Sequence, residues 1–176
     1  MFRRRLKIIL PLLISCLGVG VFLFTHHNWN RLPAGTKIDR IVVEKAERRL
    51  SILRGGRTLK TYRVALGRNP VGTKQEEGDM KTPEGVYKID YRNPNSDYHL
   101  ALHISYPSEE DNARAAQRGV NAGFDIMIHG LPNGRGWIGA AHRQKDWTVG
   151  CIAVTDGEIE ELWQVTPDGT TIEIRP

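Results

Sequence analysis

Residues 8–24 constrain the fold most, because seventeen consecutive residues without a charge do not suit the surface of a small globular domain. Their length is at the short end of what crosses a hydrocarbon core, for which about 20 apolar residues are typical. Arg3, Arg4, Arg5 and Lys7 precede the run, and such basic clusters stay on the cytoplasmic side of a membrane. The pattern therefore predicts a single-pass membrane segment, with the rest of the chain exported.

Three interpretations of this segment compete. A cleaved signal peptide needs small residues at a cleavage site, and residues 25–29, Thr-His-His-Asn-Trp, provide a poor one. Residues 13–16 resemble a lipoprotein processing box ending at Cys16, but the apolar run continues beyond that cysteine. We favour an uncleaved signal anchor. The predicted organisation is a cytoplasmic basic end plus anchor at 1–27, a linker at 28–36 and one catalytic domain at 37–176.

The charge of the chain is concentrated in the N-terminal segment. The net charge is +5, with 25 Lys and Arg against 20 Asp and Glu. Four of the basic residues and none of the acids fall in residues 1–30, so the remainder holds 25 − 4 = 21 against 20. A nearly neutral domain lacks the basic surface that reads phosphates. We therefore expect no nucleic-acid partner.

The exported part has the pattern of a mainly β protein with a few short helices. Residues 38–43, 49–54 and 58–66 carry apolar side chains in strand-like runs, and Gly55 and Gly56 suit a hairpin turn. These features predict an antiparallel meander at the start of the domain. Further strands are expected at 86–91, 98–104, 125–128 and 170–174, and helices with capping boxes are expected after Ser108 and Thr155.

A glycine- and proline-rich stretch, residues 67–85, interrupts the strands. So many turn-forming residues indicate tight turns at the surface or against a ligand. The glycine spacing matches neither the dinucleotide fingerprint nor the phosphate-binding P-loop. The stretch therefore gives no support to a nucleotide cofactor, and we expect no cofactor.

One histidine and one cysteine, each beside a glycine, are the candidate catalytic pair. His129 precedes Gly130 and Cys151 follows Gly150. A thiol and an imidazole are the minimum apparatus for cysteine nucleophilic catalysis. Cys151 is the only cysteine after the predicted anchor, so it has no partner for an internal disulfide in the exported domain. The simpler alternative is a small buried hydrophobe, which free cysteine often is.

The segment between the two residues suits a loop that faces a substrate. It is rich in small residues and carries isolated aromatic and basic side chains. A solvated loop has the same composition, so each side chain alone is weak evidence. The candidates for substrate binding in this loop are Arg135, Trp137, His142 and Arg143.

Four motifs together resemble the L,D-transpeptidase catalytic domain, the YkuD family, over roughly residues 37–175. They are Gly78-Asp79 with Thr82-Pro83-Glu84-Gly85, His103-Ile104-Ser105-Tyr106-Pro107, Ile126-Met127-Ile128-His129-Gly130, and Gly150-Cys151-Ile152. The resemblance implies a mixed β-sandwich and a cell-wall enzyme acting on peptidoglycan stem peptides. It implies attack on the amide between the third residue, a diamino acid, and a terminal D-residue.

The residues suggest how such an enzyme works. Cys151 reacts as a thiolate, and an imidazolium at His129 would lower its pKa and later protonate the leaving amine. Gly150, Gly130 and Thr148 are candidates for positioning or for the oxyanion hole. Tyr106 and His103 are further candidates for substrate contacts. No acidic residue adjoins His129 in the sequence, so a backbone carbonyl is a candidate to orient it.

Departures from the family pattern leave alternatives open. Val149 and Ala153 differ from the usual polar residue before Gly-Cys and the usual Arg or Asn after it. Losing a guanidinium there removes a carboxylate binder, which makes hydrolysis, as a carboxypeptidase or an amidase, the main alternative to transpeptidation. A catalytically inactive wall-binding module is a second alternative. A zinc site built from Cys151, His129 and His142 or His103 is a third, but its spacing fits no compact zinc motif, so we expect no metal.

Overall fold

A computed structural model describes residues 31–176, and residues 34–176 form one compact unit. The predicted anchor at residues 8–24 lies outside the described residues, as do the first three residues of the predicted linker, 28–30. In the described range, no helix has the length and apolar character needed to cross a membrane. The division into anchor, linker and catalytic domain therefore stays a prediction.

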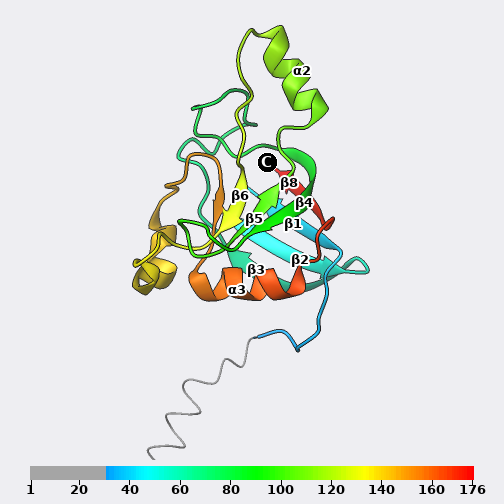
Figure 1. The fold of residues 1–176 in the computed structure, drawn as a ribbon, viewed down its shortest axis with the longest axis vertical. Helices are drawn as coiled ribbons and strands as arrows, with labels where there is room; N and C mark the ends of the chain where they lie inside the picture. Colours follow the sequence, from blue (N-terminus) through cyan, green and yellow to red (C-terminus); the bar gives the residue numbers. More distant parts are fainter. Residues whose placement is uncertain (1–30) are drawn as a thin grey trace, which may run out of the picture. The chain divides into compact units, whose positions relative to one another are not determined.

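The described domain is mainly β, as predicted. Its strands follow one another laterally in the order β3-β2-β1-β8-β4-β5-β6-β7 and form a curled sheet (Figure 1). Two neighbouring pairs are parallel, β1 with β8 and β6 with β7, and the other pairs are antiparallel. The strands are β1 (Arg40–Glu44), β2 (Arg49–Arg54), β3 (Arg57–Arg63), β4 (Gly85–Asn93), β5 (Ala101–Ile104), β6 (Met127–His129), β7 (Ile152–Ala153) and β8 (Thr171–Arg175).

The predicted antiparallel meander is confirmed in β1, β2 and β3. Gly55 and Gly56 form the tight connection between β2 and β3 with φ of 56° and 77°, which glycine adopts without the steric cost of a side chain. Ile41, Leu50 and Ile52 are fully buried, so the strands are held by their apolar side chains as well as by backbone hydrogen bonds.

Strand β8 joins the two halves of the sheet. Ile41 of β1 pairs with Ile172, and Tyr87 of β4 pairs with the same residue from the other side. Ile172 is fully buried as a result. Strand β8 thus lies between β1 and β4, which are separated by about 40 residues in the sequence. It connects the meander to the part of the sheet that contains β6 and β7.

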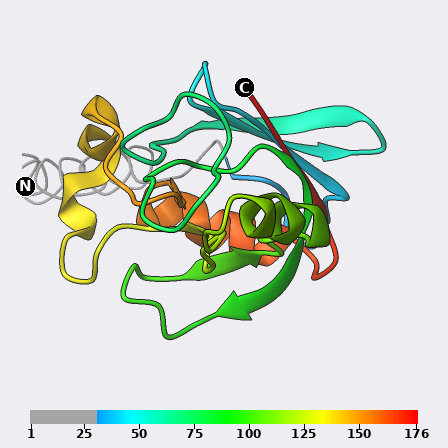
Figure 2. The ribbon, with the colours of Figure 1, turned by 90° about the horizontal axis from the view of Figure 1, so that it is seen from above.

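Both expected capping boxes are present. Ser108 caps α2 (Glu109–Gln117) with Asp111, and Thr155 caps α3 (Asp156–Val165) with Glu158. Figure 2 shows α3 between the strands of the meander and β5. Its buried side chains include Ile159 and Leu162, so α3 covers the concave side of the curled sheet. Its N-terminus follows directly on β7.

The segment between β6 and β7 contains short helical structure that the sequence analysis treated as a loop. A 3-10 segment, η1 (Gly136–Gln144), is broken at Gly139, where φ is 50° and ψ is −137°. The segment is short and rich in small residues with an internal glycine, so its sequence shows no helical periodicity from which 3-10 structure could be predicted. The turn nevertheless makes the segment compact beside the catalytic pair.

Candidate active site

The sheet brings His129 and Cys151 to one cavity. His129 ends β6 and Cys151 directly precedes β7, and the parallel register places Ile128 beside Ile152 and His129 beside Ala153. Both side chains line a cavity of about 460 Å³. The residues predicted as a catalytic pair are therefore gathered at one site by the pairing of two very short strands.

Two other segments complete this cavity. The β4–β5 connection supplies most of one wall, and the chain between β3 and β4 contributes a guanidinium from Arg68. The remaining lining residues flank the catalytic pair in sequence. The whole lining consists of Arg68, Asn93, Asn95, Ser96, Asp97, Tyr98, Asp125, Met127, His129, Trp147, Thr148, Val149 and Cys151.

His129 is held in one orientation by rings and by a backbone carbonyl. Its ring centroid lies 4.5 Å from that of Tyr98 and 5.7 Å from that of Trp147. Its Nδ1 lies 2.7 Å from the carbonyl oxygen of Gly130. A carbonyl only accepts hydrogen bonds, so this contact assigns the proton of the neutral imidazole to Nδ1 and leaves the lone pair on Nε2. The expected backbone orientation of His129 is thus present.

Burial favours the neutral form of both members of the pair. It lowers the pKa of His129 to about 4, and the hydrogen bond to Gly130 only partly opposes this effect. Burial also raises the pKa of the Cys151 thiol, against a smaller lowering by the backbone of Met127. The resting state differs in this respect from the thiolate–imidazolium pair expected from the sequence. The reason is desolvation, because a charged group loses its hydration in a buried site.

Cys151 projects from a turn that Gly150 and Thr148 shape. The Thr148 hydroxyl donates to the carbonyl of Cys151 at 2.7 Å and accepts from the N–H of Gly150 at 3.2 Å. Gly150 has φ of 143°, and a Cβ there would lie 2.9 Å from the carbonyl oxygen of Lys81. Glycine is therefore required twice, by its backbone angle and by the close approach of another segment. Thr148 stabilises the turn in the way a positioning residue does.

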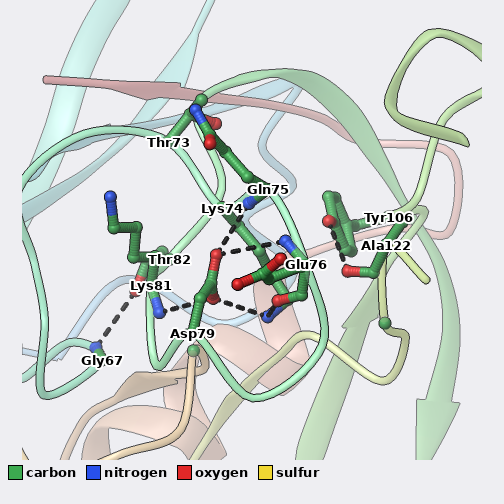
Figure 3. A network of polar contacts seen from close by, with 12 residues as sticks. Gly67, Thr73, Lys74, Gln75, Glu76, Asp79, Lys81, Thr82, Tyr106 and Ala122 are labelled. Carbon is green, nitrogen blue, oxygen red and sulfur yellow. Dashed lines mark hydrogen bonds and ion pairs between the residues drawn. The ribbon is translucent and has the colours of Figure 1, made fainter. Parts of the chain in front are cut away.

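The glycine-rich stretch, residues 67–85, approaches this turn through the Lys81 carbonyl, and Figure 3 shows polar contacts within the stretch. The Asp79 carboxylate accepts hydrogen bonds from the N–H groups of Gln75 and Lys81 at 2.7 and 3.0 Å, and it pairs with the ammonium of Lys74 at 2.9 Å. Burial alone would raise the pKa of Asp79, but these hydrogen bonds outweigh it and lower the pKa. The stretch faces the catalytic turn through the Lys81 carbonyl, so its tight turns serve to place Gly150.

The remaining predicted residues of the β6–β7 segment lie around a second cavity or outside both. Arg135 and His142 line a neighbouring cavity of about 540 Å³, and Trp147 borders both cavities. The indole N–H of Trp147 donates to Nδ1 of His142 at 3.3 Å. Trp137 is 84% exposed, and Arg143 pairs with Glu158 of α3.

Neither His103 nor Tyr106 is among the residues that line the cavity of His129 and Cys151. Tyr106 is buried, and its hydroxyl donates to the carbonyl of Ala122 at 2.8 Å. His103 stacks on Tyr91 with ring centroids 4.3 Å apart, and its Nε2 lies 3.9 Å from the carboxylate of Asp125, which does line the cavity. The role of both side chains in substrate binding stays a prediction.

Sequence reasoning missed Arg68, Tyr98 and the polar β4–β5 connection. The register of β5 with β6 places Ala101 opposite His129, so the residues just before β5 lie beside the histidine. The polar run Asn93–Asp97 between two predicted strands was a usable signal, because loops next to a catalytic strand end often contact substrate. Arg68 had no such signal, since only the fold brings its segment next to Thr148.

The zinc alternative lacks a ligand cluster in the described domain. Within residues 31–176, no three His, Cys, Asp or Glu side chains are placed to hold one metal ion. Structural zinc requires four ligands and catalytic zinc usually three from the protein. Cys151 is a free thiol.

A family model and a curated relative match this chain. The family described as the L,D-transpeptidase catalytic domain matches residues 38–174. "Putative L,D-transpeptidase YafK" of Escherichia coli K12 is 30% identical over 108 residues, which are 60% of this chain and 36% of that protein. The chain thus spans about a third of the length of this relative.

Solved structures show the same fold. The helical cell shape determining protein Pgp2 of Campylobacter jejuni matches with a TM-score of 0.61 and 25% identity, over 81% of this chain and 49% of Pgp2. Protein Bd1075 of Bdellovibrio bacteriovorus matches with a TM-score of 0.53 and 26% identity, over 82% of this chain and 50% of its own. An L,D-transpeptidase from Mycobacterium smegmatis, 12% identical with a TM-score of 0.53 over 81% of this chain and 60% of its own, agrees in fold.

Proposed function

The chain belongs to the family of L,D-transpeptidase catalytic domains, and we propose that it is a cell-wall cysteine enzyme acting on peptidoglycan stem peptides through a thioester on Cys151. The observation that carries this proposal is the shared cavity of His129 and Cys151, with Nδ1 of His129 bonded to Gly130 and Nε2 left as the proton acceptor. L,D-transpeptidation, which cross-links or attaches a stem peptide, is the favoured reaction.

The neutral resting pair sets the order of proton transfers. As the Cys151 sulfur attacks the carbonyl carbon of the scissile amide, its proton passes to Nε2 of His129. The resulting imidazolium then protonates the leaving amine, and the thioester remains on Cys151. An acceptor amine, or water, attacks the thioester while His129 takes the proton of the attacking group, and the Cys151 thiolate that leaves takes this proton back from the imidazolium. Each half of the reaction therefore ends with the neutral histidine that burial favours.

The oxyanion that forms during attack requires donors near Cys151. The N–H of Gly150 already donates to Thr148, so this group is committed to shaping the turn. The backbone N–H of Cys151 itself is the better candidate donor, because it adjoins the reacting sulfur. Gly150 then contributes through its shape, by leaving room for the substrate beside the nucleophile.

Arg68 is the proposed binder of a substrate carboxylate. Ala153, at the position where the family commonly carries Arg or Asn, is fully buried. Arg68 instead lines the catalytic cavity, with its Nε donating to the carbonyl of Trp147 at 3.2 Å. A guanidinium is suited to pair with a carboxylate. Arg68 is thus proposed to supply the cation that Ala153 does not.

The domain is proposed to act on the exported side of the inner membrane. The apolar run at residues 8–24 follows four basic residues and provides a signal anchor. Stem peptides are reached from that side, and an anchored enzyme remains close to newly made wall. Stem peptides and the membrane are therefore the proposed partners.

The test is to incubate the chain with purified tetrapeptide muropeptides and to resolve the products by mass spectrometry. Cross-linked dimers or amine-exchanged peptides are expected, and tripeptide alone would assign a carboxypeptidase. Cys151→Ala and His129→Ala should abolish product, whereas Cys16→Ala is the matched control that removes the other thiol. Full activity of Cys151→Ala would refute the proposal.

Hydrolysis is the competing function, because buried Ala153 contributes no cation to hold an acceptor strand. It predicts turnover in which water outcompetes added amines, or release of a protein-linked peptide when free tetrapeptides are inert. An inactive wall-binding module would bind muropeptides without product and without reaction of Cys151 with thiol reagents.

A further inference from the structure

One peptide unit links His129 to a carboxylate that does not touch the histidine. The unit joins Gly130 to Leu131. Its carbonyl oxygen lies 2.7 Å from Nδ1 of His129. Its N–H donates to Oδ1 of Asp156 at 2.8 Å. The imidazole and the carboxylate are therefore bonded to opposite ends of the same amide.

The surroundings of Asp156 are built for this contact. Asp156 is the first residue of α3, and Thr155 and Glu158 fix the start of that helix. A Cβ added at Gly130 would lie 2.8 Å from Oδ1 of Asp156, and one added at Gly136 would collide with Oδ2. Two glycines thus leave the room that the carboxylate occupies. The approach of Asp156 to the backbone next to His129 depends on both of them.

An anion at the N–H end of an amide strengthens its carbonyl as an acceptor. Hydrogen bonds in a chain polarise one another, and bonds to an ionised partner are the stronger ones. The Gly130 carbonyl consequently carries more negative charge and holds the Nδ1 proton more firmly. This stabilises the imidazolium relative to the neutral ring, in the direction opposite to the burial of His129.

We propose that Asp156 is a positioning residue that acts on His129 through the Gly130–Leu131 peptide, as the third member of a Cys–His–peptide–Asp arrangement. This inference rests on the proposed thiol chemistry. In a triad with direct contact, a carboxylate orients the histidine and stabilises the imidazolium that forms during attack. Here the peptide unit transmits both effects, so the reaction gains a carboxylate although none adjoins His129 in the sequence.

Other ionisable groups near the pair differ from Asp156 in how they reach it. Within the described residues, the ionisable groups that line the same cavity as His129 are Arg68, Asp97, Tyr98, Asp125 and Cys151. His142 lies outside this cavity, and its imidazole and that of His129 repel each other when both are protonated. All of these act through space or through solvent. Asp156 is distinguished by a hydrogen bond to the amide that itself binds Nδ1.

Asp156→Asn is the informative variant, because an amide oxygen still accepts the Leu131 N–H without the negative charge. Asp156→Ala removes the acceptor as well. Asp39→Asn is the matched control, since the Asp39 carboxylate also accepts a backbone N–H, from Gly55 at 2.7 Å, in the hairpin region far from Cys151 in sequence. All are compared in the full chain with Cys16→Ser, so that Cys151 is the only thiol.

The measurement is the rate of alkylation of Cys151 by iodoacetamide as a function of pH. Near neutral pH both groups rest in the neutral form, and alkylation draws on the minor population in which the thiol proton has moved to His129. This population falls about tenfold for each unit by which the pKa of His129 falls. Asp156→Asn should therefore lower the neutral-pH rate several-fold, and Asp156→Ala should lower it further. Above the pKa of the thiol the rates should converge with wild type, because the thiolate no longer needs the imidazolium.

The outcomes separate this inference from the proposed function. A pH profile of Asp156→Asn that superimposes on wild type and on Asp39→Asn would overturn the role of Asp156, even if muropeptide activity is intact. A uniform loss of rate at every pH, or a loss of folded protein, would make Asp156 merely structural and would also overturn it. Failure of the proposed function would instead be seen as wild-type protein that turns over no muropeptide.

Discussion

The burial of His129 predicts a specific loss of stability in acid. Its pKa lies at about 4 in the folded protein against 6.5 for an accessible histidine. Between these pH values His129 is protonated in the unfolded chain but neutral in the folded protein. The contribution of His129 to the free energy of unfolding therefore rises with pH in this window and is lost as the pH falls. A difference of about 2.5 pKa units corresponds to about 3 kcal/mol, most of which is lost by about pH 4.5.

The perturbation is His129→Asn, which retains a polar side chain and cannot titrate in this range. Urea unfolding of residues 31–176, followed by tryptophan fluorescence from pH 4.5 to 7.5, gives the free energy of unfolding at each pH. Wild type should lose about 2–3 kcal/mol more than the variant across this interval. Subtracting the free energy of unfolding of the variant from that of wild type at each pH cancels the contribution of the carboxylates that both proteins contain.

A companion variant tests the assignment. Burial also lowers the pKa of His142 to about 4, with a further lowering from Arg143. His142→Asn should therefore reduce the pH dependence in the same direction, and its effect is coupled to that of His129 because the two imidazoles repel each other when both are charged. If wild type and His129→Asn lose stability in parallel as the pH falls, the histidine is not buried in its neutral form and the proton order proposed for catalysis is wrong.

Three further changes test separate parts of the structure. Gly150→Ala should lower kcat more than tenfold and should lower the free energy of unfolding in urea by about 2 kcal/mol. Both effects are expected because the φ of Gly150 is 143° and because an added Cβ would lie 2.9 Å from the Lys81 carbonyl oxygen. Gly157→Ala, in open space on α3, is the control and should leave stability unchanged or raise it. Lys45→Met should cost about 2–3 kcal/mol by the same assay, since it strands the Glu84 carboxylate and two carbonyls that the buried ammonium satisfies. Arg68→Ala should raise KM for muropeptides about tenfold with a smaller change in kcat if it binds a carboxylate without taking part in proton transfer.

Local signals in the sequence predicted most of the elements that frame the site. The helix that begins after Thr155 follows from a capping box, and the hairpin at Gly55 and Gly56 follows from two residues that tolerate positive φ. These are short-range effects, so the sequence alone specifies them. Strand β7 was not predicted, because its two residues are too few to show any periodicity.

The arrangement of the strands did not follow from local pattern. Strand β8 lies between β1 and β4, which are far apart from it in the sequence. The residues Thr171–Arg175 predict a strand, but their pattern does not indicate which strands pair with it. The catalytic pair was predicted from residue type, flanking glycines and family resemblance. Arg68 was not, since its place in the cavity depends on which segments the fold brings together.

The charge state of the pair shows why position in the sequence is a poor guide to electrostatics. A cysteine near a histidine suggests an ion pair, yet the packing of Tyr98 and Trp147 around His129 removes the water that an imidazolium needs. A carboxylate beside the ring would offset the cost of charging the histidine but would also occupy space in the cavity. On our proposal Asp156 offsets this cost through the Gly130–Leu131 peptide, and it is not among the residues that line the cavity.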